Sequence, residues 1–282
     1  MTKFHLILDI ESRVEPTSHV RYQMMERFVP TPGGGDSGRR GQRGADDPLT
    51  TPRWPLQEIV TVVAMTCVEH SGGNIEPLEM VTLSKPDLGE REIIEGLFAV
   101  IANLPVGESE LVTYGGANHD LPLLVVRAMS HGLSLPKGWD WLAFGGHGKV
   151  PHLDLLRVVT GGFKLKAVHM AELAAVIDVP AKVTDAAWSA ARHIKNERWE
   201  IVQSMCECDV ITTALLFASW RTLLDGRCPV DTAHDRICRK VEELRPQRDY
   251  THAFTAKRAA LFQRQIIAAE AKLETCGGAY AG

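Results

Sequence analysis

The pattern of apolar and polar positions divides the chain into a strand-rich first half and a helical second half. Short apolar runs bounded by polar residues are typical of buried strands, and they occur at 3–11, 58–67, 75–83 and 110–114. Apolar residues at helical spacing predict helices at 90–104 and about 120–131. The order β-β-β-α-β-α combines a meander with a crossover, which predicts a mixed sheet.

The second half is expected to be helical, with prolines as breaks. Helical patterns occur at about 154–160, 168–177, 184–194, 196–222, 232–244 and 254–275. Pro180 and Pro229 interrupt this pattern, because a proline cannot continue a helix and pushes the preceding residue out of helical geometry. We therefore expect one α/β domain over residues 1–228 and a helical C-terminal extension over 229–282.

Two stretches show neither the alternation of a strand nor the apolar spacing of a helix. Residues 31–52 include the run GGGDSGRRG, which cannot bury enough apolar surface to offset its ordering entropy. This run predicts a flexible insertion, whose arginines either contact phosphates or simply face solvent. The glycine-rich loop 133–150 carries Trp139, Trp141 and Phe144. These rings either stack on nucleic-acid bases or pin the loop onto the core.

Composition narrows the class of protein without naming an activity. The 282 residues are 45% hydrophobic and 23% charged, as in ordinary soluble globular proteins. A net charge of −4 gives no overall signature of nucleic-acid binding, although a local basic patch can still provide one. The six cysteines are scattered apart from Cys206 and Cys208, which favours buried reduced thiols over zinc ligands. We expect neither a signal peptide nor an apolar run of membrane-spanning length. The protein is therefore expected to be cytoplasmic, with no membrane partner.

Paired acids at the end of the first strand are the first candidate for chemistry. Asp9 and Glu11 are two residues apart, so on a strand both side chains point to the same face. Two close carboxylates repel each other and lose hydration, and a hard divalent cation such as Mg²⁺ or Mn²⁺ would resolve both problems. The alternative is a strand end whose acids face solvent.

Two further acids lie in contexts that could join this pair. Asp120 follows a strand and the glycine turn Gly115-Gly116, at the start of a helix. Asp209 lies in a long helix with apolar positions before and after it. A carboxylate that faces inward on such a helix should not be left unpaired.

Three motifs in this order resemble the DEDD superfamily of 3′→5′ exonucleases. The matching text is Asp9-Ile10-Glu11, the acid Asp120, His152-Leu153-Asp154-Leu155, and Cys206-Glu207-Cys208-Asp209-Val210 with Thr213. The resemblance spans about residues 3–225, and it is most similar to the stand-alone branch related to the proofreading domain of family-B DNA polymerases. It implies an α/β, ribonuclease-H-like fold with a mixed β-sheet flanked by helices.

The resemblance also implies a two-metal mechanism with Mg²⁺ or Mn²⁺. Asp9 would bridge both ions, Glu11 and Asp209 would complete one site, and Asp120 would hold the other ion mainly through water. A nucleoside 5′-monophosphate would be released from a 3′ end. Substrate contacts are predicted for Asn118, His119 and Asp154.

One position departs from the family pattern. The family places a tyrosine four residues before the last acid, or a histidine five before it, to orient or deprotonate water. Here Met205 and Ser204 occupy those positions, and neither is a general base at neutral pH. Three interpretations stay open: catalysis without a base, substitution by His119 or His169, and nucleic-acid binding without cleavage.

The leading hypothesis is an exonuclease on single-stranded DNA or unpaired 3′ ends. A non-catalytic binding module and an exoribonuclease are the alternatives, because nothing in the sequence identifies a group that reads the 2′-hydroxyl. The stretch 236–264 has eight basic and three acidic residues, which either follow a phosphate backbone or form a solvated helix face. Little sequence remains for a polymerase domain, so proofreading would need a partner. Residues 229–282 are the candidate surface for a partner or for self-association.

Overall fold

The protein was examined as a computed structural model that describes residues 2–27, 49, 51–144, 151–185, 189–226 and 228–277. The flexible insertion predicted at 31–52 therefore lies outside the described residues, apart from positions 49, 51 and 52.

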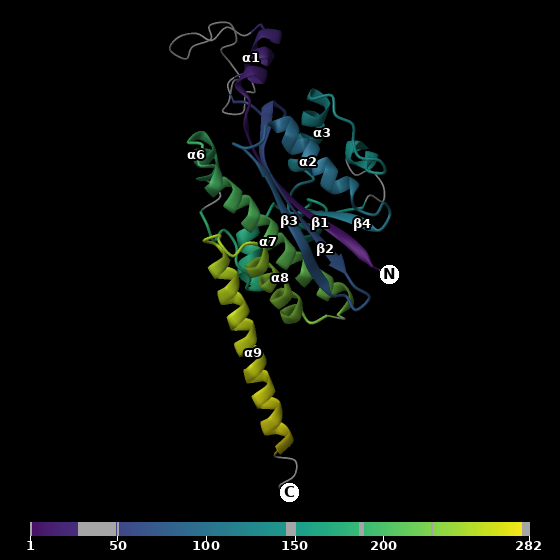
Figure 1. The fold of residues 1–282 in the computed structure, drawn as a ribbon, viewed down its shortest axis with the longest axis vertical. Helices are drawn as coiled ribbons and strands as arrows, with labels where there is room; N and C mark the ends of the chain where they lie inside the picture. The colour runs from purple at the N-terminus through teal and green to yellow at the C-terminus, as the bar shows by residue number, and fades with distance from the viewer. Residues whose placement is uncertain are drawn as a thin grey trace.

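A mixed five-stranded sheet forms the centre of the molecule (Figure 1). Its strands are β1 (Lys3–Val14), β2 (Gln57–Glu69), β3 (Ile75–Ser84), β4 (Ser109–Thr113) and β5 (His152–Asp154). The spatial order is β3-β2-β1-β4-β5. Antiparallel pairing joins β1 to β2 and β2 to β3, whereas β4 is parallel to both β1 and β5. The predicted mixed sheet of a ribonuclease-H-like fold is confirmed.

Helices cover both faces of this sheet. The helices of the described residues are α1 (Pro16–Met25), α2 (Glu90–Ala102), α3 (Asp120–Ser130), α4 (Leu155–Val159), α5 (Met170–Ile177), α6 (Ala190–Lys195), α7 (Trp199–Asp225), α8 (Val230–Leu244) and α9 (Thr251–Gly277). Two short 3₁₀ helices are η1 (Trp54–Leu56) and η2 (Asp140–Phe144). One hydrophobic cluster joins α2 and α3 to the sheet, and a second joins α7, α8 and the start of α9 to its other face.

The central strand β1 divides its side chains between these two clusters. Leu6 and Leu8 pack with α2 and α3, whereas Ile7 packs with α7. Because side chains alternate along a strand, Asp9 and Glu11 lie on the α7 side. A register shift between Glu11 and Ser12 interrupts the regular pairing with β2 directly after the acids.

Helix α7 is the main cover of that face. Its length and the mean hydropathy of 1.4 over its most apolar window would allow it to cross a membrane. No such segment was expected from the sequence. However, 83% of that window is buried inside the protein. Such burial is also found in the core helices of soluble proteins.

Helix α8 and the start of α9 belong to the same core as α7. Ile237, Cys238, Tyr250 and Phe254 are all buried in the cluster that contains Phe217 of α7. The helices after residue 228 therefore share a core with the preceding domain. The domain boundary at residue 228 stays a prediction.

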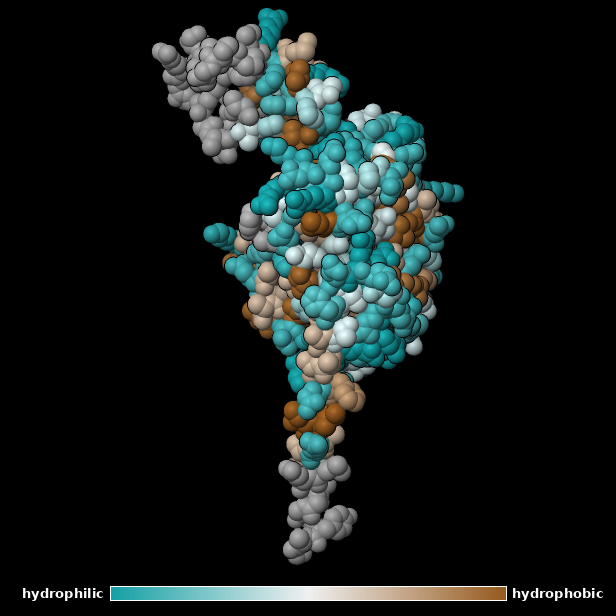
Figure 2. Space-filling model, turned by 60° about the vertical axis from the view of Figure 1, so that its left-hand side comes forward, coloured by the Kyte–Doolittle hydropathy of each residue, from teal (hydrophilic) through white to brown (hydrophobic). Residues whose placement is uncertain are grey.

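The second half of α9 projects beyond the body (Figures 1 and 2). Phe262 is 64% exposed and Ile267 is 56% exposed, and hydrophobic side chains are visible along this projection (Figure 2). Partner binding or self-association through this extension stays a prediction.

Candidate active centre

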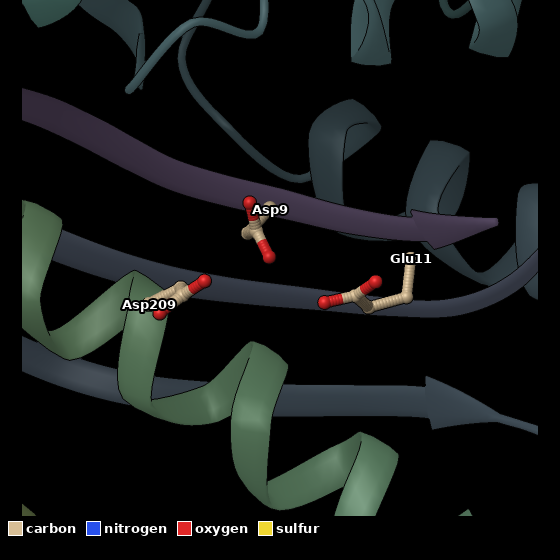
Figure 3. A group of neighbouring side chains, drawn as sticks. All are labelled: Asp9, Glu11 and Asp209. Atoms are coloured by element: carbon tan, nitrogen blue, oxygen red, sulfur yellow. The ribbon is translucent and has the colours of Figure 1, made fainter. Parts of the chain in front are cut away.

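Three carboxylates converge between β1 and α7 (Figure 3). One oxygen from each of Asp9, Glu11 and Asp209 lies within 4.8 Å of the others. Asp9 and Glu11 come from the same face of β1, and Asp209 reaches them from α7. Acids that lie about 200 residues apart in sequence are thus brought into one group.

The electrostatics of this group are unfavourable without a cation. Burial and then the nearby Asp209 raise the pKa of Asp9 well above its ordinary value. Burial and then the charges of Asp9 and Asp209 raise the pKa of Glu11. Burial also raises the pKa of Asp209, and its Oδ1 atom is buried with no hydrogen-bond partner among the described residues. In the metal-free protein, each of these carboxyl groups therefore takes up a proton at a higher pH than a solvent-exposed carboxyl group does.

Asp120 lies beside this group without being part of it. It is the first residue of α3 and is 7% exposed. Its pKa is raised by burial and then by the charges of Asp9 and Glu11, so it is close enough for those charges to act on it. Its predicted role as a ligand that acts through water stays a prediction.

A glycine turn and one buried aspartate position Asp120. Gly115 has a φ of +82°, and a Cβ on Gly116 would lie 2.8 Å from the Cβ of Thr113. The Asp154 carboxylate accepts hydrogen bonds from the backbone N–H of Gly115 at 2.8 Å and of Ala117 at 2.9 Å. Because Asp154 is only 3% exposed, this geometry makes it a positioning residue, and its predicted substrate contact stays a prediction.

Two residues of the centre were not foreseen from the sequence. The Lys182 ammonium donates a hydrogen bond to Asp209 Oδ2. Although burial works against its charge, Asp209 raises the pKa of Lys182. The Cys206 thiol lies 3.2 Å from Asp9 Oδ2 and donates to it. Lys182 lies in a loop without periodicity, so no sequence signal marked it, whereas Cys206 was seen only as part of a motif.

The predicted base positions contain no group poised to take a proton. Met205 is buried, with 4% exposed, and Ser204 lines a separate cleft beside residues 244–252. His119 Nε2 lies 3.3 Å from Ser12 Oγ, and burial lowers the pKa of His119. His169 caps α5, because its Nδ1 accepts a hydrogen bond from the N–H of Ala171 at 3.2 Å.

The remaining predicted contact residue, Asn118, is exposed at the turn before α3. It therefore lies where a substrate could reach it, and its contact stays a prediction, as do those of the two histidines.

The donor set fits a divalent metal ion. Asp9, Glu11 and Asp209 supply the oxygen ligands that Mg²⁺ and Mn²⁺ prefer, and Asp209 has a buried oxygen that no described group satisfies. Lys182 is the cation that pairs with Asp209 in the metal-free protein. One ammonium for three clustered acids leaves negative charge for a metal ion to balance.

Comparison with known proteins agrees with this geometry. A family model described as a predicted 3′-5′ exonuclease related to the exonuclease domain of PolB matches residues 52–258. The chain belongs to this family. The match includes Asp120 and Asp209, whereas Asp9 and Glu11 precede it and are brought to Asp209 by the fold.

Comparison with solved structures also found similar chains. A family B DNA polymerase from the hyperthermophilic archaeon Pyrobaculum calidifontis is 16% identical with a TM-score of 0.44, over 86% of this chain. The chain spans 29% of the length of that polymerase. A comparison with curated proteins found no match.

The acid group predicts an unusual pH dependence for this exonuclease-family protein. Raised carboxyl pKa values mean that the folded state binds more protons than the unfolded state above about pH 4. Without metal, this centre's contribution to the free energy of unfolding should therefore be present at about pH 4 and decline towards neutral pH. Saturating Mn²⁺ should remove this decline and raise the melting temperature by about 5 °C.

Thermal melts in chelator and in Mn²⁺ between about pH 5 and 8 measure this effect. Glu243→Gln, which removes an exposed acid on α8, is the control and should leave the response to Mn²⁺ unchanged. Equal melting temperatures with and without Mn²⁺ at the upper end of this range would contradict metal binding by the acid group.

Proposed function

We propose that this protein is a divalent-metal-dependent 3′→5′ exonuclease that releases nucleoside 5′-monophosphates from single-stranded DNA or unpaired 3′ ends. The observation that carries the proposal is the convergence of Asp9, Glu11 and Asp209 within 4.8 Å, in a chain whose family is described as a predicted 3′-5′ exonuclease. Without this convergence, membership of the family alone would not show whether this chain can hold the metal ions that cleavage needs.

The proposed roles follow from where each side chain lies. Asp9, Glu11 and Asp209 would hold one ion, and Asp9 with Asp120 would hold a second. When bound, such a pair of ions supplies a nucleophilic water at neutral pH and stabilises the attacking and leaving oxygens of an in-line displacement. Cys206 orients the Asp9 carboxylate through its thiol, and Lys182 orients the Asp209 carboxylate.

Cleavage of a 5′-labelled single-stranded DNA oligonucleotide in Mg²⁺, Mn²⁺ or chelator tests the proposal. We expect a ladder that shortens from the 3′ end with either metal and no ladder in chelator. The RNA strand of the same sequence, in competition, tests the preference for DNA. Intact DNA with both metals, at protein concentrations that bind it, would contradict the nuclease proposal.

A specific observation favours a second candidate, a nucleic-acid-binding module that does not cut. Met205 fills the general-base position with a buried apolar side chain, and Ser204 lies in a different cleft. Metal-dependent DNA binding without shortening would support this candidate. The acid group favours catalysis, because a buried cluster of carboxylates is costly to retain without a metal-dependent role.

Met205→Tyr separates a slow enzyme from a binding module. Residues four apart share a helix face, so a tyrosine at 205 lies on the same face of α7 as Asp209. General bases contribute about 10²–10⁴-fold, and we expect the cleavage rate to rise by about 10-fold or more. Met205→Phe is the matched control, since it adds the ring without the hydroxyl. Equal rates in the two variants would contradict this role for position 205.

A further inference from the structure

A pocket of about 270 Å³ is lined in part by the turn before α3 and by the first half of that helix, whose first residue is Asp120. Its walls are mainly apolar and aromatic, and they include Trp54, Trp141, Leu121 and His152. The indole of Trp141 stacks on His152, with ring centroids 6.3 Å apart and planes at 21°. Both tryptophans are half-buried, so each leaves part of its ring surface uncovered.

The pocket is linked to the candidate active centre by one short segment. Ala117 and Leu121 line the pocket, while Asp120 responds to the charges of Asp9 and Glu11. Neighbouring residues at a helix start point in directions about 100° apart, which lets Asp120 and Leu121 serve two sites. The same segment contacts the end of β1, because His119 Nε2 lies 3.3 Å from Ser12 Oγ, next to Glu11.

A positive charge stands at the pocket with no partner in the described part of the chain. Arg157 lines the pocket and is exposed, and no described carboxylate pairs with its guanidinium. Burial lowers the pKa of His152, the charge of Asp154 opposes this shift, and the Arg157 charge adds to it. The pocket thus offers stacking surfaces together with one available cation, which complements an aromatic ring that carries a phosphate.

We propose that this pocket binds one unpaired base of the substrate strand, with the adjoining phosphate at Arg157. The proposal rests on the proposed nuclease function and adds a subsite to it. Pockets for drug-sized ligands occupy about 300–1,000 Å³, so this smaller one suits a single base rather than a peptide helix. Base–aromatic stacking tolerates any sequence, because every base has a π-face.

An abasic walk tests the subsite by binding alone. Fluorescence anisotropy measures the affinity of the full-length Asp9→Asn protein for oligothymidine with one abasic residue at successive positions from the 3′ end. We expect one position to lose about 5- to 100-fold in affinity, as for one stacked base. In a Trp141→Leu protein this loss should vanish. Trp220→Leu, which removes a half-buried indole on α7, should retain it.

Arg157→Gln is a second variant that leaves the core untouched. It should weaken binding at every sequence and reduce the salt slope of log affinity by about 1, whereas Arg239→Gln on α8 should do neither.

The subsite would be overturned if the abasic residue had the same effect at every position, or if the position-specific effect persisted in Trp141→Leu. It would also be overturned if thymidine monophosphate bound as tightly as the strand, because the pocket would then belong to a free nucleotide. If DNA binds with no abasic effect at any position, the subsite is overturned and the nuclease proposal stays intact. If the abasic effect is position-specific but the wild type does not cleave DNA, the nuclease proposal is overturned and the subsite stays intact.

Discussion

Replacing Asp9 by asparagine should lower the metal-dependent cleavage rate by about 10³-fold. Removing one group that stabilises developing charge costs about 10²–10³-fold, and Asp9 is expected to contact both metal ions, which places it at the upper end. The asparagine keeps the shape of the side chain and an oxygen that can accept from Cys206. Quantified product ladders at saturating Mn²⁺ measure the change.

Stability shows whether that loss comes from chemistry or from unfolding. Asp9→Asn removes one of three mutually repelling acids, so the metal-free variant should melt at or above the temperature of the wild type. Asp87→Asn, an exposed acid outside the centre, is the matched control and should keep full activity. An active Asp9→Asn protein would refute the assignment of the centre.

Replacing Glu207 by glutamine should destabilise the protein by about 3–5 kcal/mol, the usual effect of removing one partner of a buried ion pair. Glu207 is 0% exposed and lies two residues before Asp209. Its carboxylate accepts hydrogen bonds from Thr82 at 2.6 Å, Arg248 at 2.9 Å and Tyr250 at 2.9 Å. Glutamine keeps the volume of the side chain but leaves the partly buried charges of Arg245 and Arg248 without this carboxylate.

Urea unfolding measures the effect of Glu207→Gln. The exposed Glu243 pairs with Lys240 at 3.0 Å on the surface of α8, and Glu243→Gln should leave the free energy of unfolding close to that of the wild type. The Glu207 variant should also lose activity at temperatures where the wild type is stable, since the contacts of Glu207 hold α7, and with it Asp209, against β3 and the start of α9. A loss below about 1 kcal/mol for Glu207→Gln would show that these contacts are dispensable.

Local pattern was enough for most elements of this fold. The runs predicted at 58–67 and 75–83 correspond to β2 (Gln57–Glu69) and β3 (Ile75–Ser84). The helix predicted at 120–131 corresponds to α3 (Asp120–Ser130). Strand β2 is buried on both faces over 59–69 and so shows as a continuous apolar run, whereas α3 buries one face at helical spacing.

The missed elements lack such a face. Helix α1 (Pro16–Met25) has no buried residue, so no apolar stripe marks it. Strand β5 (His152–Asp154) has three residues, too few for a period, and it ends where a helix was predicted to begin. It forms because the exposed edge of β4 pairs with it.

The candidate centre shows the same division. Asp9 and Glu11 had to share a face, because side chains alternate along any strand, and the motifs supplied Asp120 and Asp209 as their partners. Lys182, in contrast, reaches Asp209 from a loop 27 residues earlier.

The sequence by itself thus predicted the family, the mixed sheet and the four candidate acids, because these depend on local periodicity and on short motifs. Only the tertiary structure decided that Lys182 and Cys206 touch those acids, that Glu207 joins α7 to the C-terminal helices, and that Trp54 and Trp141 line one pocket. Each of these contacts joins segments distant in the chain, and only the packing of the folded chain specifies which distant side chains meet.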